Sequence, residues 1–321
     1  MSFSERPLLI VIVGPTGSGK TALSIRLAQH YDAPIISTDA RQIFRGMAIG
    51  TAQPTAEELA AATHYFIASH DIHEQYTCGR YEQEALTKLE ELFAAGHRTV
   101  VAVGGAGLYV KALCEGIDDI PQASEELREQ LSQRLRERGV EDLFAELERL
   151  DPTYAAEVDR HNPARVQRAL EVCLASGRTF SEFRTGEKRT RNFDIIKIGT
   201  EMDRAELYDR IDRRVDMMMT EGLEAEARAL YPFRHLNSLQ TVGYKEMFDY
   251  FDGLCSRDEA VELIKRNSRR YAKRQLTWFR RDEQVIWHDP RDVEGVITCI
   301  EQAKRDLPQR DSPRSRSPYR A

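Results

Sequence analysis

The chain has 321 residues, of which 41% are hydrophobic and 31% charged, with a formal net charge of −6 and five cysteines. This length allows about two domains with packed cores, so neither disulfides nor a structural metal are needed for stability. No apolar run approaches the ~18 residues of a membrane span, the cysteines form no C-x-x-C pair, and the amino end lacks a signal peptide. These features predict a cytoplasmic protein with reduced thiols.

The amino-terminal part of the chain has the pattern of an α/β domain. Residues 8–13 (LLIVIV) form an apolar run that ends in glycine, as a buried parallel strand does, and residues 22–30 have helical apolar spacing. Further strands are predicted at 34–37 and 99–103. Strands that alternate with helices indicate a parallel sheet.

The pattern of apolar and charged residues changes after residue 120. Between 124 and 191 there is no strand-like run, and apolar residues recur at helical spacing, which predicts an all-helical insertion. A strand at 194–199, helices at 206–219, 223–230 and 257–281, and a strand at 284–288 follow. The predicted fold is an α/β P-loop parallel-sheet core with an all-helical insertion domain: core 1–120, insertion 121–192, core with a basic helix 193–305, and a disordered tail 306–321.

The segment GPTGSGKT matches the phosphate-binding pattern G-x-x-x-x-G-K-[ST] and lies between a predicted strand and a predicted helix. Its glycines let backbone N–H groups point at phosphate oxygens, Lys20 supplies positive charge, and the Thr21 hydroxyl can hold Mg²⁺. The expected phosphate-binding residues are Gly14, Pro15, Thr16, Gly17, Ser18, Gly19, Lys20 and Thr21. The sequence therefore predicts a phosphorylated substrate, with Mg²⁺ as cofactor and Thr21 as its ligand.

The carboxylate that ATPases and GTPases place at a strand end to hold Mg²⁺ is missing, because the strand at 99–103 ends in GGAGLY. The nearest strand-end carboxylate is Asp39, which follows the strand at 34–37 and should lie at the ligand-binding edge of the sheet. A lone aspartate can simply form a turn or a helix cap. A carboxylate beside the phosphates, however, predicts a base for an incoming nucleophile.

The helix at 257–281 contains a strongly basic segment. Residues 265–281 (KRNSRRYAKRQLTWFRR) carry eight cationic side chains and no acidic ones. Arg266, Arg270, Lys273 and Arg274 share one face by helical spacing, whereas Tyr271, Gln275 and Trp278 lie on another face that we expect to turn toward the core. A solvated charged face is the plain interpretation, but a helix of one sign in an acidic protein favours contact with a polyanion such as RNA.

These motifs together resemble the bacterial tRNA dimethylallyltransferases (isopentenyl-tRNA transferases) over residues 8–281. The matching blocks, in chain order, are GPTGSGKT, STDARQIF, GTAQP, VGGAGLY, DPTYAAEVDRHNPARVQRALEV, TVGYKE and YAKRQLTWFRR. A P-loop alone would be unspecific, but seven blocks in order are highly specific.

The resemblance implies transfer of a dimethylallyl group from dimethylallyl diphosphate to N6 of the adenosine 3′-adjacent to the anticodon in tRNA. Lys20 and Thr21 would act on the diphosphate and Asp39 would take the amine proton, so the three are the expected catalytic residues. The target base would have to leave its stack. The expected partners are the tRNA anticodon stem–loop and the diphosphate donor, with no membrane and a monomeric enzyme.

The resemblance also implies a set of tRNA-contacting residues. They are Asp39, Ala40, Arg41, Gln42, Ala106, Arg128, Ala164, Arg165, Val166, Gln167, Arg168, Gly243, Tyr244, Lys245, Arg270, Lys273 and Arg274. Ala106 is a departure, because the family commonly has threonine or serine there, and the resemblance implies that one hydrogen bond near the reacting amine is missing and that transfer is slower.

Three alternatives remain open at this point. An adenylate dimethylallyltransferase would perform the same chemistry on a free nucleotide, but would not need the insertion or the basic helix. A P-loop small-molecule kinase would turn over ATP. An RNA-binding protein with a relict P-loop would be non-enzymatic, which the intact Gly19, Lys20, Thr21 and Asp39 disfavour.

Overall fold

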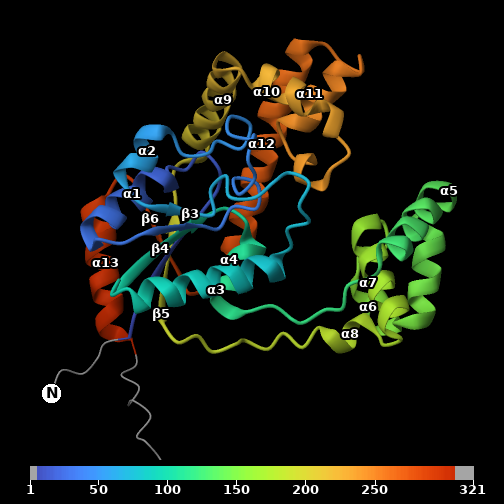
Figure 1. Cartoon of the computed structure of the whole chain (residues 1–321), viewed down its shortest axis with the longest axis horizontal. Coiled ribbons are helices and arrows are strands. Elements are labelled where there is room, and N and C mark those ends of the chain that lie inside the picture. Colours follow the sequence, from blue (N-terminus) through green and yellow to red (C-terminus); the bar gives the residue numbers. More distant parts are fainter. Residues whose placement is uncertain (1–5, 308–321) are drawn as a thin grey trace, which may run out of the picture. The chain divides into compact units, whose positions relative to one another are not determined.

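The computed structural model describes residues 6–307, which form two compact units (Figure 1). The larger unit, the core, runs to Cys114 and resumes at Arg191, and the smaller unit, the insertion, comprises Glu115–Thr190. The sequence predicts the insertion at 121–192, so its start is placed six residues late and its end two residues late. The last helix ends at Asp306, and the predicted tail lies outside the described residues from 308 onward.

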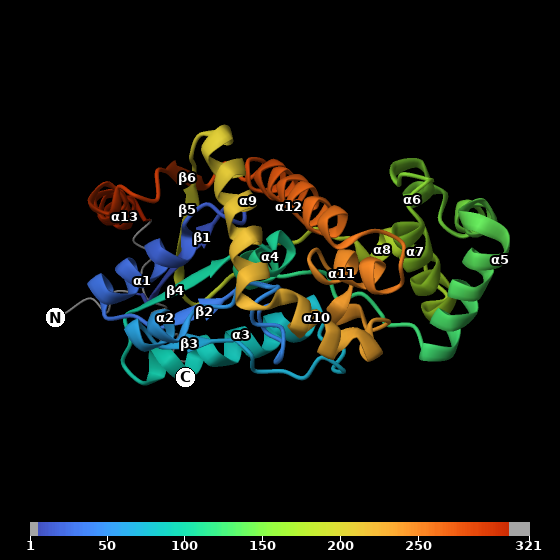
Figure 2. The same cartoon turned by 90° about the horizontal axis from the view of Figure 1, so that it is seen from above.

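One six-stranded parallel sheet organises the core, in the order β3-β2-β4-β1-β5-β6 (Figure 2). The strands are β1 (Leu8–Val13), β2 (Ile35–Ser37), β3 (His64–Tyr65), β4 (Thr99–Gly104), β5 (Asp194–Thr200) and β6 (Val285–His288). β1 is central, since Ile10 pairs with Val101 of β4 on one side and Ile196 of β5 on the other. All six residues of β1 are buried, as expected for a parallel strand that is covered on both faces.

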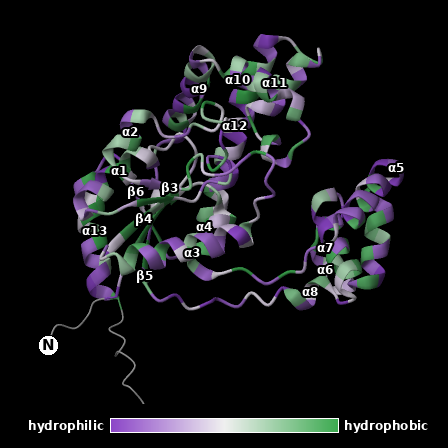
Figure 3. Cartoon of the chain, viewed as in Figure 1, coloured by the Kyte–Doolittle hydropathy of each residue, from purple (hydrophilic) through white to green (hydrophobic). Residues whose placement is uncertain are grey.

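Helices cover both faces of this sheet. Side chains of β1 alternate between them: Ile10 and Ile12 pack with α1 (Lys20–Tyr31) and α13 (Val293–Asp306), whereas Leu9 and Val11 pack with α3 (Cys78–Ala94) and α4 (Gly107–Glu115). Figure 3 shows the strands as the most uniformly hydrophobic part of the core. The sheet therefore forms a rigid platform whose carboxyl edge can carry a site.

A second layer of helices lies beyond that edge. It consists of α9 (Arg204–Glu221), α10 (Leu223–Leu230), α11 (Tyr244–Phe251) and α12 (Arg257–Phe279), with 3₁₀ turns η1 (Tyr231–Phe233) and η2 (Asn237–Leu239). The short helix α2 (Ala56–Ala61) does not belong to this layer and packs against α1. Val215 of α9, Tyr244 of α11 and Ile264 of α12 share one apolar cluster with Ile43 and Met47, which follow β2. This cluster fixes α9, α11 and α12 against the loops of the sheet.

All the regular secondary structure of the insertion is helical, as the sequence predicts, and loops connect its helices. It contains α5 (Glu125–Leu150), α6 (Pro152–Glu157), α7 (Pro163–Ser176) and α8 (Phe180–Phe183). α5 is interrupted at Gly139, where φ is 81°, a conformation that favours glycine. Leu143 and Leu147 of α5 pack against Val166 and Leu170 of α7. Across residues 6–307, no helix combines the length and apolar character needed to cross a bilayer.

Candidate active site

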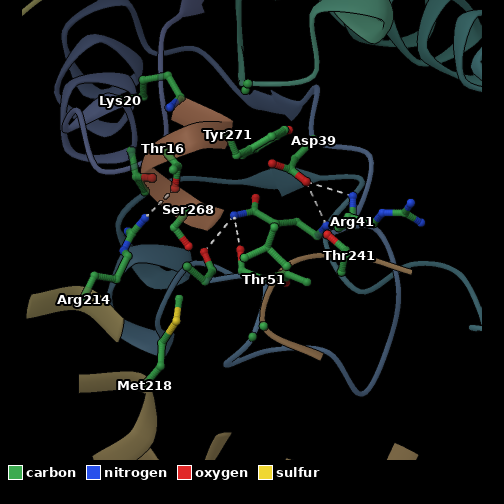
Figure 4. Close-up of a pocket in the computed structure, with 18 of the residues that line it drawn as sticks. Thr16, Lys20, Asp39, Arg41, Thr51, Arg214, Met218, Thr241, Ser268 and Tyr271 are labelled. Carbon is green, nitrogen blue, oxygen red and sulfur yellow. Dashed lines mark hydrogen bonds between the residues drawn. The ribbon is translucent and has the colours of Figure 1, made fainter. Parts of the chain in front are cut away.

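A pocket opens at the carboxyl ends of β1, β2 and β4, where the P-loop, the loop after β2, α9 and α12 come together (Figure 4). Its wall includes Thr16, Lys20, Thr21, Asp39, Arg214, Met218, Ser268 and Tyr271. The sequence predicts Lys20, Thr21 and Asp39 as catalytic residues, and the structure places all three in this one pocket.

The P-loop has the geometry of an anion cradle. α1 begins at Lys20, and its N-cap Gly19 has a φ of 89° and offers no side chain to the free N–H groups of the first turn. No acidic residue lies in that turn, so its N–H groups and the positive end of the helix dipole remain available to an anion. Thr16 and Thr21 line the pocket, whereas Ser18 is fully buried and its hydroxyl lies 2.6 Å from that of Thr200. Among the predicted phosphate-binding residues, the side chain of Ser18 therefore anchors the loop to β5 and does not face the pocket.

Two cations face this cradle without a carboxylate partner among the described residues. Lys20 Nζ donates to the carbonyl of Pro15 at 2.6 Å, and Arg214 Nη1 lies 3.5 Å from the Thr16 hydroxyl. Burial, together with the charge of Arg214, lowers the pKa of Lys20 to about 7, and burial also lowers the pKa of Arg214. Placing two partly buried cations together is unfavourable unless an anion joins them. The arrangement is therefore suited to a multiply charged phosphate group.

Arg214 is a site residue that sequence reasoning missed. It lies on α9, which begins 183 residues after the P-loop ends, and no local motif marks it. Its only signal in the sequence is its place in the apolar periodicity of α9, where Ile211 and Val215 are buried on the same side of the helix. The apolar spacing predicts that Arg214 lies on the buried side of α9, but it does not identify the group that neutralises its charge.

Asp39 is held with one oxygen fixed and the other available. Its Oδ1 accepts hydrogen bonds from the backbone N–H of Arg41 at 2.8 Å and of Gln42 at 3.2 Å. No donor within the described chain reaches Oδ2. Figure 4 shows the carboxylate turned toward the pocket, near the ring of Tyr271. Burial, assisted by the charge of Asp39, raises the pKa of Tyr271 to about 12. One oxygen thus forms the turn, and the other is free to accept a proton or a hydrogen bond from a ligand.

Gln275 of α12 connects the P-loop to the loop after β4. Its Oε1 accepts from the N–H of Thr16 at 2.9 Å, and its Nε2 donates to the carbonyl of Gly105 at 3.0 Å. Gln275 is buried, as predicted. The same prediction is wrong for Tyr271 and Trp278, which are 37% and 43% exposed. Helical spacing places them beside Gln275, but Tyr271 lines the open pocket and Trp278 covers Gly107 at the surface.

The residues around Thr21 fit a Mg²⁺ ion that is held mainly by phosphate oxygens. The side chains of Thr21, Ser37 and His64 line the same pocket. His64 Nδ1 lies 2.8 Å from the carbonyl of Ala62, and its buried Nε2 has no partner. The described chain has no cluster of three His, Cys, Asp or Glu side chains that could bind a metal alone. Mg²⁺ bound to phosphates usually keeps several of its waters. The Thr21 hydroxyl could serve as a ligand of such an ion, and the unpartnered His64 Nε2 could bind one of its waters.

Some of the predicted RNA-contacting residues of the core are accessible to a ligand, and others are held inside the protein. Gln42 and Gly243 line the pocket with Asp39 and Arg41, and Lys245 is exposed at the first turn of α11. Arg41 Nη1 donates to the carbonyls of Asn237 and Ser238, and Ala40 and Ala106 pack against the apolar cluster beneath the pocket. Tyr244 is fully buried, with its hydroxyl 2.7 Å from Glu226 Oε1. A contact between Tyr244 and RNA would have to come from its backbone.

The basic residues of α12 are free to meet a polyanion. Arg266, Arg270, Lys273 and Arg274 are exposed, and none of them pairs with a carboxylate among residues 6–307. Their neighbours Lys265 and Arg269 do pair, with Asp216 and Asp212 of α9. The guanidinium of Arg274 lies over the ring of Tyr271, 5.7 Å from its centroid. The unpaired cations thus form one exposed face, and the paired ones fasten α12 to α9.

In the insertion, the predicted RNA-contacting residues lie near the start of α7 and in the first turn of α5. Ala164 and Arg165 are exposed, while Val166 is fully buried in the helical core and can offer RNA only its backbone. Gln167 Nε2 donates to Ser132 and Glu171. Arg168 donates to the carbonyl of Pro121, and Arg128 Nη2 lies 3.4 Å from Gln122 Oε1.

The chain is similar to curated proteins over most of its length. The chain is 49% identical over 293 residues to tRNA dimethylallyltransferase 1 of Bacteroides fragilis, covering 91% of this chain and 97% of that protein. It is 51% identical over 292 residues to tRNA dimethylallyltransferase 2 of Porphyromonas gingivalis, with the same coverage.

Solved structures show the same fold. The tRNA isopentenylpyrophosphate transferase of Bacillus halodurans superimposes with a TM-score of 0.69 at 38% identity, covering 94% of this chain and 98% of that one. A eukaryotic dimethylallyltransferase acting on tRNA gives a TM-score of 0.76 at 26% identity, covering 92% of this chain and 77% of that one. The model of the IPP transferase family matches residues 42–282, and the chain belongs to this family.

Proposed function

We propose that the protein transfers a dimethylallyl group from dimethylallyl diphosphate to N6 of the adenosine 3′-adjacent to the anticodon in tRNA. The observation that carries this proposal is the meeting of Lys20, Arg214 and the free oxygen of Asp39 in one pocket. Two cations suit a diphosphate leaving group, and a carboxylate acceptor suits an amine that must lose a proton. The relatives named above give the chemical class.

The leaving group occupies the P-loop end of the pocket in this proposal. As the bond between the first carbon of the dimethylallyl group and its bridging oxygen breaks, negative charge develops on the diphosphate. Lys20, Arg214 and the N–H groups of the first turn of α1 stabilise that charge, because they are already oriented toward it. Mg²⁺, when bound at Thr21, supplies further neutralisation of the diphosphate charge.

Asp39 receives the proton in the same step. The adenine N6 forms a bond to the first carbon of the dimethylallyl group, and the proton that N6 loses passes to Oδ2 of Asp39. The two backbone hydrogen bonds to Oδ1 keep the carboxylate in place while this happens. The reaction balances with dimethylallyl-adenosine and diphosphate as products, and no water enters the chemistry.

The adenine reaches this pocket only as an unstacked base. Tyr271, exposed at the pocket, offers an aromatic face, and Arg270, Lys273 and Arg274 on the same helix offer charge to the RNA backbone. The exposed arginine of α7, Arg165, gives the insertion its own cationic surface. These features favour RNA over a free nucleotide as the acceptor.

The test is transfer of label from dimethylallyl diphosphate, in the presence of Mg²⁺, to an unmodified anticodon stem–loop RNA or to AMP, offered in parallel. We expect label on the RNA and none on AMP. Label on AMP would instead assign the protein as a free-nucleotide transferase. ATP turnover with no transfer to either acceptor would indicate a kinase. RNA binding without any transfer would indicate a non-enzymatic RNA-binding protein.

A further inference from the structure

One face of α9 runs along the pocket from its polar end to its apolar end. Ile211, Arg214, Val215 and Met218 all line the pocket, and their spacing of three and four residues places them on a single side of the helix. Ile211 and the Arg214 guanidinium lie beside the P-loop, and the side chains of Val215 and Met218 follow along the same face. A ligand that lies along α9 would therefore have a cation near its P-loop end and only hydrocarbon and a thioether at its other end.

The position of each residue along α9 can be anchored to the P-loop. A Cβ atom added to Gly17 would come within 2.9 Å of Ile211 Cγ1, so Ile211 lies against the loop itself. Arg214 reaches Thr16 one turn later. Met218 follows Ile211 by seven residues, which corresponds to about 10 Å along the helix axis at the usual rise per residue. Met218 is also the last described residue of α9 that lines the pocket.

The pocket ends in a packed wall at Met218. Met218 packs against the apolar cluster that contains Val215, Leu223, Ile264 and Met247, each at most 2% exposed. Figure 4 shows Met218 at the opposite end of the pocket from Lys20 and Asp39, with Arg214, Ser268 and Thr51 between them. A chain growing away from the P-loop along α9 would thus reach a thioether that is backed by a close-packed core.

We propose that Met218 is the stop that limits the prenyl chain of the donor to five carbons. This proposal rests on the proposed function and adds the residue that sets its donor specificity. With the diphosphate on the P-loop, the five-carbon chain fills the distance to Met218, and a ten-carbon chain would have to displace the thioether and the side chains behind it. Shortening Met218 to alanine removes its Cγ, Sδ and Cε atoms and lengthens the apolar end of the pocket. The flexible methionine side chain fills that end without requiring a rigid fit.

The neighbouring methionine provides a matched control. Met217 points about 100° away from Met218 around α9, is 57% exposed and is not among the residues that line the pocket. Met217→Ala makes the same chemical change on the same helix without changing the pocket. Any general effect of losing a methionine from α9 should therefore appear in both variants.

The experiment measures binding and transfer with dimethylallyl diphosphate and geranyl diphosphate for the wild type, Met218→Ala, Met218→Phe and Met217→Ala. Binding is measured by calorimetry without RNA, and kcat/KM with anticodon stem–loop RNA. We expect the ratio of geranyl to dimethylallyl affinity to rise at least tenfold in Met218→Ala, and dimethylallyl binding to fall at least tenfold in Met218→Phe. Met217→Ala should match the wild type.

The outcomes separate this proposal from the function on which it rests. A wild type that transfers the dimethylallyl group, with an unchanged donor ratio in Met218→Ala and normal binding in Met218→Phe, would overturn the role of Met218 and leave the function standing. A wild type that binds dimethylallyl diphosphate but transfers it to no acceptor would overturn the function, while the binding ratios would still decide the role of Met218. A wild type that binds neither donor would overturn both.

Discussion

The cationic side chains of the core pocket and those of the insertion differ in what neutralises them. In the pocket, Lys20 and Arg214 have no carboxylate partner among the described residues, and burial lowers the pKa of both. In the insertion, Arg134 donates to Asp142 and Glu146 at 2.6 Å each, and these partners raise its pKa. The chain therefore pairs Arg134 with its own carboxylates, whereas the two pocket cations have no such partner within residues 6–307.

Whether a cation has a carboxylate partner within the chain distinguishes ligand-binding side chains from structural ones more clearly than the local density of charge does. The insertion is rich in arginine, yet Arg178 pairs with Glu182 and Arg184 with Glu157. Such exposed pairs contribute little to stability, and each already has a partner within the chain. Two cations left facing each other are costly without a ligand, which gives them a functional meaning. Substitutions in the two regions should accordingly affect different properties.

The largest effect is expected at Asp39. Asp39→Ala removes the proposed proton acceptor, and we expect the rate of transfer to RNA to fall by about a hundredfold to ten-thousandfold. Because Asp39 does not hold the diphosphate, the dissociation constant for dimethylallyl diphosphate should change little. Single-turnover transfer and calorimetry measure the two quantities. Transfer at the wild-type rate by a folded Asp39→Ala protein would remove Asp39 from the mechanism.

Asp151 is the buried carboxylate of the insertion, and its removal should lower stability and leave donor binding unchanged. Its carboxylate is fully buried and accepts from the N–H of Tyr154, from the N–H of Ser181 and from the Ser181 hydroxyl. Asp151→Ala leaves these donors without a partner, and should destabilise the insertion by about 2–4 kcal/mol. Urea unfolding measures this loss.

The control for Asp151 is Asp159→Ala, since the Asp159 carboxylate is exposed and accepts from the N–H of His161. We expect a cost below about 1 kcal/mol for that variant. Donor binding by the core should be normal in both. Loss of dimethylallyl diphosphate binding in the Asp151 variant would contradict the separation of the two regions.

The pKa of Lys20 predicts a smaller, pH-dependent effect. Because this pKa is lowered to about 7 in the free protein, Lys20 is charged below pH 7 and becomes neutral as the pH rises through that value. An anionic donor binds the charged form better, so its affinity should fall by up to about tenfold per pH unit above 7 and be nearly constant below. Calorimetry between pH 6 and 9 measures this dependence.

Lys20→Met should bind weakly and lose most of the dependence on pH above 7. If the wild type and Lys20→Met show the same pH profile, the titrating group is not Lys20, and the charge of the pocket must be assigned differently.

The sequence predicted those parts of the fold and site that depend on local pattern. The apolar run of β1, the glycines of the P-loop and Lys20 lie within thirteen consecutive residues, so their spacing alone identified them. β3 was missed because it has only two residues, His64 and Tyr65, and owes its existence to pairing with β2. Arg214 was missed because its role depends on how α9 packs against a loop far away in the sequence.

The most direct test of this account compares Arg214→Met with Arg134→Met in their binding of dimethylallyl diphosphate, measured by calorimetry at constant pH and Mg²⁺. Removing the unpaired Arg214 should weaken binding by about 2–5 kcal/mol, that is, at least about thirtyfold. Removing the paired Arg134 should leave the dissociation constant within about twofold of the wild type. Equal effects of the two substitutions, or unchanged binding by Arg214→Met, would contradict the claim that the unpaired cations of the core exist to hold the diphosphate.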